Sequence, residues 1–209
     1  MKIPLFPLDL VLFPGAPLPL HIFEPRYREM IGELESAGRN RRLNPEPVFG
    51  IVRMQQGGLA ITGCTARITQ VLERFEDGRM NILCEGGRRF EIETLDAGSK
   101  SYLQAEVDWL EDSGPAATRV ERSLCAASHF EAMELSGLGT GPVAMNLDKD
   151  ISFVLATALP ADPAFKQQLL ASVSEAERVE LLMRYYDMLL PELRRHAPML
   201  RGPETGRVN

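Results

Sequence analysis

Phosphate binding is the first chemistry that the residue types suggest, because Gly98-Ser99-Lys100-Ser101 has the composition that ends a nucleotide-binding loop. The earlier glycine of that motif and its strand-to-helix setting are both absent. Ser99 and Lys100 do not form a hydrolytic Ser-Lys dyad either, because adjacent residues of an extended chain point to opposite faces. We therefore expect this segment to bind no nucleotide and to carry no protease chemistry.

A second glycine-rich segment has Gly137, Gly139 and Gly141 in a G-x-G-x-G run, which raises the question of dinucleotide binding. A dinucleotide loop requires a strand before it, a helix directly after it and an acidic residue ~20 residues further on. Here a helical pattern comes before the glycines, and Pro142 follows them. The run is more typical of a loop between two helices.

Metal and disulfide chemistry lack clustered ligands. The cysteines are odd in number and have neither the spacing of a disulfide framework nor that of a zinc site, and the histidines are dispersed. These residues are Cys64, Cys84, Cys125, His21, His129 and His196. His21 lies in an apolar run, where a hydrogen-bonded packing role is the usual outcome. The sequence therefore indicates no metal ion and no other cofactor.

Acid–base catalysis has candidates in Asp9, Glu24 and Asp148, but the sequence shows no paired arrangement of them. Asp9 is better explained as a partner of backbone donors in a proline-rich turn, and Glu24 as facing the start of a helix at Pro25. The main expectation is a non-catalytic protein. A small hydrolase with an unrecognised active site stays open as an alternative, supported only by scattered Ser, His and Asp residues.

The composition is that of an ordinary globular protein: 209 residues, of which 44% are hydrophobic and 25% charged, with a formal net charge of -6. The negative charge does not favour a nucleic acid or an anionic membrane as the main partner. Lys2 is followed by prolines rather than by the apolar core of a signal peptide. Because no apolar stretch reaches the ~18 residues of a membrane helix, we expect a cytoplasmic location.

Strand and turn patterns dominate the first half of the chain and predict a β-rich subdomain over residues 1–112. Its opening is extended and rich in proline, and a short helix begins at Pro25 and ends near Gly38. Asp77-Gly78 separates two β-like runs and predicts a hairpin. Gly86-Gly87 lies inside the return strand and suggests a bulge or a barrel corner.

Helical patterns fill the second half, which predicts a helical subdomain over residues 113–198 and a flexible tail over 199–209. Asp162 is placed to cap one helix, and Ser174 with Glu177 forms a capping-box pattern for the last one. The predicted fold class is α+β: an N-terminal small coiled sheet or partial barrel with one short helix, followed by a C-terminal helical bundle.

Three segments carry motifs in a recognisable order. The first is LFPLDLVLFPGAPLPLHIFEPRYREMI, with landmarks at Leu12-Phe13-Pro14-Gly15, Leu18-Pro19-Leu20 and Glu24-Pro25-Arg26-Tyr27. The landmarks of the second are Gly63, Ala66, Ile68, Asp77, Gly78, Gly86, Arg89 and Phe90, and those of the third are Lys166, Gln167, Leu170, Glu177 and Arg178. Through these motifs, residues 2–195 resemble the Lon N-terminal (substrate-binding) domain family.

The resemblance implies a PUA-like pseudo-barrel followed by a helical bundle, in a free-standing, bacterial-type member without the ATPase and protease domains. It implies a non-catalytic module that binds polypeptides or protein partners. We expect no nucleotide, nucleic acid or membrane as partner. The oligomeric state stays open, and a scaffold that only oligomerises is a further alternative.

The proline-rich opening offers more apolar residues than one face of a sheet can bury, since residues 10–13 are all apolar and alternate strand residues point to opposite sides. We therefore hypothesise a polypeptide-binding groove bordered by Leu12, Pro14, Pro17 and the helix start at Arg26. In this hypothesis Arg26 offers a charged anchor. The alternative is that the helical half covers all of this apolar surface.

Overall fold

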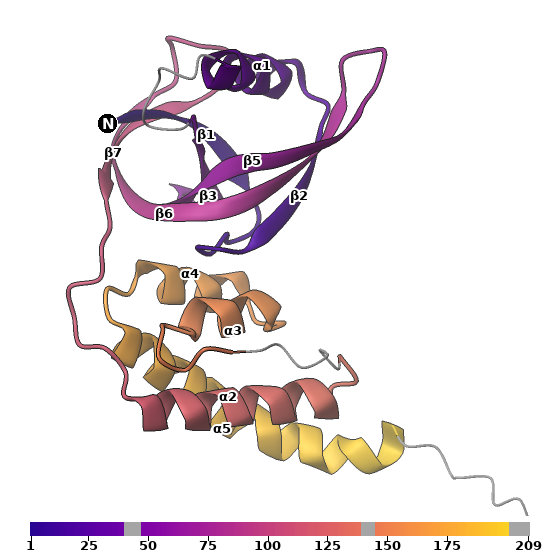
Figure 1. The fold of residues 1–209 in the computed structure, drawn as a ribbon, viewed down its shortest axis with the longest axis vertical. Coiled ribbons are helices and arrows are strands. Elements are labelled where there is room, and N and C mark those ends of the chain that lie inside the picture. The colour runs from indigo at the N-terminus through magenta and orange to yellow at the C-terminus, as the bar shows by residue number, and fades with distance from the viewer. Residues whose placement is uncertain (40–46, 139–144, 201–209) are drawn as a thin grey trace, which may run out of the picture. The chain divides into compact units, whose positions relative to one another are not determined.

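The computed structural model describes residues 1–39, 47–138 and 145–200, which form two compact units (Figure 1). The first unit comprises Met1–Glu111 together with Ala156–Ala171, and the second comprises Asp112–Leu155 together with Ser172–Asn209. The segment predicted as one helical subdomain thus contributes Ala156–Ala171 to the β-rich unit. The glycines at 139 and 141 and residues 201–209 of the predicted tail lie outside the described residues. Residues 199 and 200, predicted to begin that tail, belong instead to the last helix, Glu175–Leu200.

The first unit is built on a seven-stranded sheet that closes on itself. Its strands are β1 (Lys2–Leu8), β2 (Pro17–Ile22), β3 (Phe49–Gln55), β4 (Gly58–Leu59), β5 (Thr62–Arg74), β6 (Met80–Asp96) and β7 (Gln104–Trp109). The order β1-β7-β6-β5-β3 becomes a ring because β1 also pairs with β3, in parallel. Strand β4 pairs with β3, and β2 pairs with β6. With the C-terminal helices, this mostly antiparallel sheet confirms the predicted α+β class.

The longest pairing is the β5–β6 hairpin, and its turn lies at the predicted Asp77-Gly78. Gly78 has a φ of 84°, a left-handed conformation that glycine adopts without strain. The backbone N–H of Phe75 donates to the carbonyl oxygen of Arg79 at 2.9 Å and closes the turn. Further along, register shifts between β5 and β6 bend both strands, as bulges do.

The barrel interior is filled around the buried Phe90 ring of β6. Ile3, Leu5, Val52, Ala105 and Val107 belong to the same apolar cluster. Two glycines make room for the ring: a Cβ at Gly50 would lie 2.6 Å from the Phe90 Cζ, and a Cβ at Gly63 only 2.5 Å away. The Phe90 ring of β6 therefore fills the space that the glycines leave free on β3 and β5.

The connection between β1 and β2 is held against β6 at Gly86. The N–H of Gly15 donates to the Gly86 carbonyl oxygen at 2.8 Å, and the N–H of Gly86 donates to the Ala16 carbonyl oxygen at 2.9 Å. A Cβ at Gly86 would collide with the backbone carbonyl of Phe13. This close approach explains why a glycine stands in the middle of a long strand.

Two helices lie wholly within the first unit, α1 (Pro25–Arg39) and α4 (Pro163–Ala171). The predicted apolar stripe of α1 is turned inward, with Tyr27, Met30 and Ile31 buried. Before α4, the Asp162 carboxylate accepts a hydrogen bond from the Ala164 N–H at 2.6 Å, so the predicted cap is confirmed.

In the second unit, α2 (Arg119–Leu135) packs on α5 (Glu175–Leu200), while α3 (Ser152–Ala158) begins in this unit. Thr118 and Glu121 form a complete capping box at the start of α2. At the start of α5, only half of the predicted capping box of Ser174 and Glu177 is formed. The Ser174 hydroxyl accepts from the Glu177 N–H at 3.2 Å, but the Glu177 carboxylate accepts from the Ser172 hydroxyl.

A buried charge network holds the start of α5. Arg178 has a fully buried side chain, and its guanidinium lies 3.0 Å from the Glu175 carboxylate and 2.5 Å from that of Asp112. Its Nε donates to the Ser152 hydroxyl at 2.8 Å, and its face covers the Phe153 ring. The arginine therefore joins three separate segments of the second unit.

Within the described parts of the chain, no helix combines the length and the apolar character that a membrane span requires.

Candidate functional site

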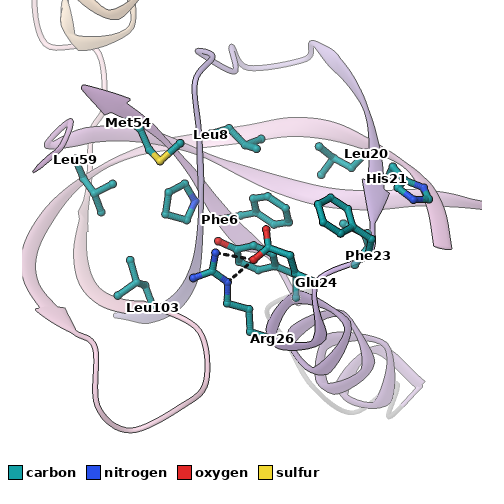
Figure 2. Close-up of a pocket in the computed structure, with 13 residues that line it drawn as sticks. Phe6, Leu8, Leu20, His21, Phe23, Glu24, Arg26, Met54, Leu59 and Leu103 are labelled. Atoms are coloured by element: carbon teal, nitrogen blue, oxygen red, sulfur yellow. Dashed lines mark hydrogen bonds and ion pairs between the residues drawn. The ribbon is translucent and has the colours of Figure 1, made fainter. Parts of the chain in front are cut away.

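A cavity of about 470 Å³ lies in the β-rich unit where the end of β1 comes close to the end of β2 and the start of α1 (Figure 2). The β3–β4 hairpin contributes to its wall. We call this cavity the β1–β2 groove. Its lining residues are Phe6, Pro7, Leu8, Leu20, His21, Ile22, Phe23, Glu24, Arg26, Tyr27, Met54, Leu59 and Leu103.

The floor of the groove is apolar and aromatic. Phe6 of β1 stacks on Tyr27 of α1 with ring centroids 4.0 Å apart and an interplanar angle of 16°. Both residues are buried, as is Ile22 at the end of β2. Burial raises the pKa of the Tyr27 hydroxyl, so this side chain stays neutral at physiological pH. The floor thus offers a preformed aromatic surface.

The rim of the groove exposes large apolar side chains. Phe23 is 58% exposed and Met54 is 48% exposed, although each lies beside an apolar cavity. Single exposed apolar residues are ordinary on a protein surface, but a contiguous apolar site marks an interaction surface. The two side chains come from different elements, β3 and the β2–α1 connection, so the fold alone brings them together.

One corner of the groove is charged. Arg26 reaches the Glu24 Oε2 with Nε at 2.9 Å and with a terminal nitrogen at 2.7 Å, as the dashed lines of Figure 2 show. The guanidinium also covers the Tyr27 ring, 4.6 Å from its centroid. Because both charged side chains are exposed, the pair stabilises the fold little and can exchange partners at low cost.

The lining is mainly apolar, and its polar members are His21, Glu24, Arg26 and Tyr27. The 13 described lining residues include no Ser, Thr, Cys or Lys that could act as a nucleophile. The His21 imidazole is turned to a neighbouring strand, with Nδ1 2.6 Å from the Asn81 side-chain oxygen. Asn81 in turn donates to the Glu73 carboxylate at 2.9 Å. This exposed chain of contacts orients His21 at the edge of the groove.

Cysteine chemistry is also unsupported elsewhere in the described chain. All three cysteines are buried and free. Burial raises the pKa of Cys64, Cys84 and Cys125 to about 12 in each case, so the reactive thiolate is scarce at neutral pH. Among residues 1–39, 47–138 and 145–200, no three His, Cys, Asp or Glu side chains gather as metal ligands.

The segment that resembles a phosphate loop is occupied by the protein's own groups. The Asp96 carboxylate accepts hydrogen bonds from the N–H groups of Gly98 and Ser99, each at 3.0 Å. The Lys100 ammonium lies 2.6 Å from the Glu33 carboxylate. The amides and the cation that would hold a phosphate are therefore already paired with carboxylates.

A second cavity, of about 350 Å³, is lined by Thr65, Arg67, Gly86, Arg88 and Trp109 among others. Its charged groups are matched within its own surroundings. Arg88 lies 2.6 Å from the Glu111 carboxylate and covers the Trp109 ring at 4.2 Å. The β1–β2 groove, with its unpartnered apolar rim, is the stronger candidate.

Of the four residues predicted to border a groove, only Arg26 lines the β1–β2 groove. Leu12 is 3% exposed and lies in the connection that packs against Gly86. Pro14 is half-buried, and Pro17 is exposed at the start of β2. Residues 9–16 bend instead of forming a strand, so the expected alternation of sides does not apply to them.

Sequence reasoning did not single out Phe6, Phe23 and Met54 as site residues. Phe23 carried a usable signal, because a large apolar residue directly before a charged helix start has no place on the strand's buried face. The sequence around Met54 carried no such signal, since Met54 reaches the groove only because the β3–β4 hairpin lies beside β1.

Comparisons with known proteins agree with one another. A family model described as the ATP-dependent protease La (LON) substrate-binding domain matches residues 2–187. A Lon protease of Parabacteroides distasonis is 28% identical over 199 residues, covering 87% of this chain and 23% of that relative. The chain therefore spans about a quarter of the length of this curated relative.

Solved structures show the same similarity. A Lon N-terminal domain protein from Xanthomonas campestris superposes with a TM-score of 0.69 at 26% identity, covering 88% of this chain and 98% of that one. The N-terminal domain of a Mycobacterium avium complex Lon protease gives a TM-score of 0.62 at 21% identity, with 90% and 98% covered. The second similarity, at 21% identity, shows only that the fold is shared.

Proposed function

The chain belongs to the ATP-dependent protease La (LON) substrate-binding domain family, and from this premise we propose that it binds polypeptide segments in the β1–β2 groove. One observation carries the proposal: Phe23 and Met54 stand exposed at the rim of an apolar cavity whose floor is aromatic. Apolar side chains of an unfolded or partly folded protein would gain free energy by leaving water there. Partner binding, rather than turnover, is the activity.

The expected ligand is a segment with large apolar side chains near a charged one. Phe6, Phe23 and Met54 offer the apolar contacts. The exposed Glu24–Arg26 pair offers a charge of either sign at the corner. Such contacts suit many sequences, which is the property that a domain binding varied polypeptides needs.

The test is a binding measurement with an unfolded probe. Fluorescently labelled, reduced and carboxymethylated α-lactalbumin is titrated with the full chain, and anisotropy is recorded. Changing Phe23→Ser together with Met54→Ser should weaken binding at least about ten-fold, because two anchors of the site are removed.

A matched control uses an exposed apolar residue outside the groove. Leu95 of β6 is 54% exposed and does not line the groove. Leu95→Ser should leave the affinity within about two-fold, since scattered surface residues contribute little. If the doubly substituted protein is folded and binds the probe as tightly as the Leu95→Ser protein, the groove is not the binding site.

A further inference from the structure

The hydrogen-bonding direction of β2 follows from its contact with β6. The Gly86 N–H donates to the Ala16 carbonyl oxygen, and the register continues with Leu18 opposite Cys84 and Leu20 opposite Ile82. In an antiparallel pair, alternate residues bond to the partner and the others point away. Ala16, Leu18, Leu20 and Ile22 therefore bond to β6. Pro17, Pro19 and His21 present their backbone groups at the opposite edge.

The direction of β1 follows in the same way. The Leu5 N–H donates to the Leu103 carbonyl oxygen at 2.8 Å, on the side where β7 lies. Strand β7 begins only at Gln104, and the residues from Leu5 onward pair with β3 on the other side. Pro7 is the next residue of β1 that points toward the β7 side. It lies where β7 no longer covers that edge.

Prolines therefore occupy the edge positions of both strands that border the groove. Proline has no N–H to donate. Across Pro7 of β1 and the β2 positions Pro17, Pro19 and His21, only His21 carries a backbone donor at these edges. A peptide that adds to a sheet edge gains its affinity from main-chain hydrogen bonds. At these edges the proline carbonyls can still accept from peptide N–H groups, but only His21 can donate to a peptide carbonyl.

An extended ligand paired along these edges would thus leave most of its facing carbonyl groups without a donor, which is costly where they are desolvated. A helical ligand avoids this cost, because its backbone N–H and C=O groups bond to each other. A helix is ~10 Å wide with its side chains, so it would lie across the mouth and insert side chains only. The cavity volume of about 470 Å³ suits a few inserted side chains.

We propose that the groove selects amphipathic helical segments, recognised through side chains, and that Pro7 in its wall and the prolines at the free edge of β2 disfavour strand addition. This inference rests on the proposed function and specifies the conformation of the ligand. The apolar face of the helix meets Phe6, Phe23 and Met54, and a charged residue beside that face pairs with Arg26 or Glu24.

Two synthetic peptides of identical composition test the proposal. One has Phe and Leu at helical spacing and a lactam bridge between residues four apart on its polar face. The other has the same residues in strict apolar–polar alternation, which favours a strand. The expected result is at least ten-fold tighter binding of the helical peptide to the unaltered full-length chain.

A variant that restores donors to the strand edges provides a gain-of-function arm. Pro7→Ala with Pro19→Ala returns one N–H to each edge, so the alternating peptide should bind several-fold more tightly than to the unaltered protein. Because the restored N–H groups donate to peptide carbonyls, replacing the facing carbonyls of the peptide by CH2 groups should cancel this gain. If the variant does not fold, the two peptides on the unaltered protein decide the question.

Equal affinity for the two peptides, or tighter binding of the alternating one, overturns the helical proposal. In that case binding of carboxymethylated α-lactalbumin that depends on Phe23 and Met54 would leave the proposed function standing. Loss of that dependence would instead overturn the proposed function and this inference together.

Discussion

Arg89 of β6 donates through Nη1 to the carbonyl oxygen of Leu170, and the two atoms lie 2.8 Å apart. Leu170 is in the last turn of α4, where carbonyl groups lack helical partners and carry partial negative charge. The arginine is buried, so this charge-assisted bond forms away from water. The Thr62 carbonyl oxygen of β5, the other strand of the β5–β6 hairpin, accepts a hydrogen bond from the Gln167 side chain of α4 at 2.9 Å. The two bonds explain why α4 belongs to the β-rich unit.

Arg89→Met should lower the free energy of unfolding by about 1–3 kcal/mol, because a buried acceptor loses its donor. Urea denaturation measures this change, and hydrogen exchange should show faster opening of α4 than of the barrel strands. The neighbouring Arg88 is the control. It is exposed and pairs with exposed Glu111, so Arg88→Met should cost less than about 1 kcal/mol. Equal losses for the two variants would contradict the anchoring role of Arg89.

Gly86→Val should destabilise the protein by at least about 1–3 kcal/mol, since a Cβ there collides with the Phe13 carbonyl and the backbone must move. Gly15→Val should also destabilise it, because Gly15 has a φ of 74° that β-branched residues resist. Gly98→Ala is the comparison, since a Cβ at Gly98 has open space around it. Thermal melts that place all three variants at the same Tm would refute this account.

Arg178→Met should be the most damaging of these substitutions, at about 3–5 kcal/mol, because it removes the nearer guanidinium of the buried Glu175 carboxylate and leaves only Arg122, at 3.9 Å. Arg184 of the same helix pairs with Glu180, and both are exposed. Arg184→Met should therefore change stability by about 0.5 kcal/mol or less. Chemical denaturation of both variants measures the contrast, and a mild effect at Arg178 would show that the network relaxes or admits water.

His129 predicts a pH dependence of stability. It is buried with Nδ1 2.8 Å from the Tyr186 hydroxyl, and burial lowers the pKa of the imidazole. The unfolded chain binds a proton near pH 6.5, whereas the folded chain does so only at lower pH. The neutral imidazole therefore favours folding fully above about pH 6.5, and this advantage shrinks as the pH falls toward the folded pKa.

The measurement is urea unfolding of the unaltered protein and of His129→Asn between about pH 5 and pH 8. Asparagine keeps an acceptor near Tyr186 but does not titrate. The stability difference between the two proteins should narrow as the pH falls below about 6.5. Parallel pH profiles would show that His129 does not titrate differently in the folded and unfolded states.

Local signals in the sequence predicted local structure well. Pro25 and the stripe of Tyr27, Met30 and Ile31 located α1, and Asp77-Gly78 located the longest hairpin. Asp162 was correctly expected to cap a helix. Each of these features depends on residues within about one turn of each other, where capping, backbone conformation and periodicity decide the outcome.

Features that depend on distant pairing could not be predicted. The parallel contact of β1 with β3 closes the barrel, and β2 pairs with the first part of β6. The residues of β1 and β2 do not indicate which strands they pair with, so the groove between these two strands could not be located from the sequence. The placement of α4 depends on Arg89, a single arginine whose helix partner is 81 positions away. The hypothesis that Leu12 borders a binding groove assumes a strand over residues 10–13, where the chain bends.

The pairing of Lys2 with Glu106 has a consequence for how the chain folds. The β5–β6 hairpin joins neighbours in sequence and can form early, whereas the first residues of β1 pair only with β7, a strand about a hundred residues later. At ~5–20 residues per second, synthesis of the intervening chain takes on the order of ten seconds. Strand β3, which pairs with β1 from Leu5 onward, is made within that interval, and until then the apolar β1 segment has no partner strand. Pro4 and Pro7 interrupt its donors and so keep the waiting segment from pairing with other nascent chains.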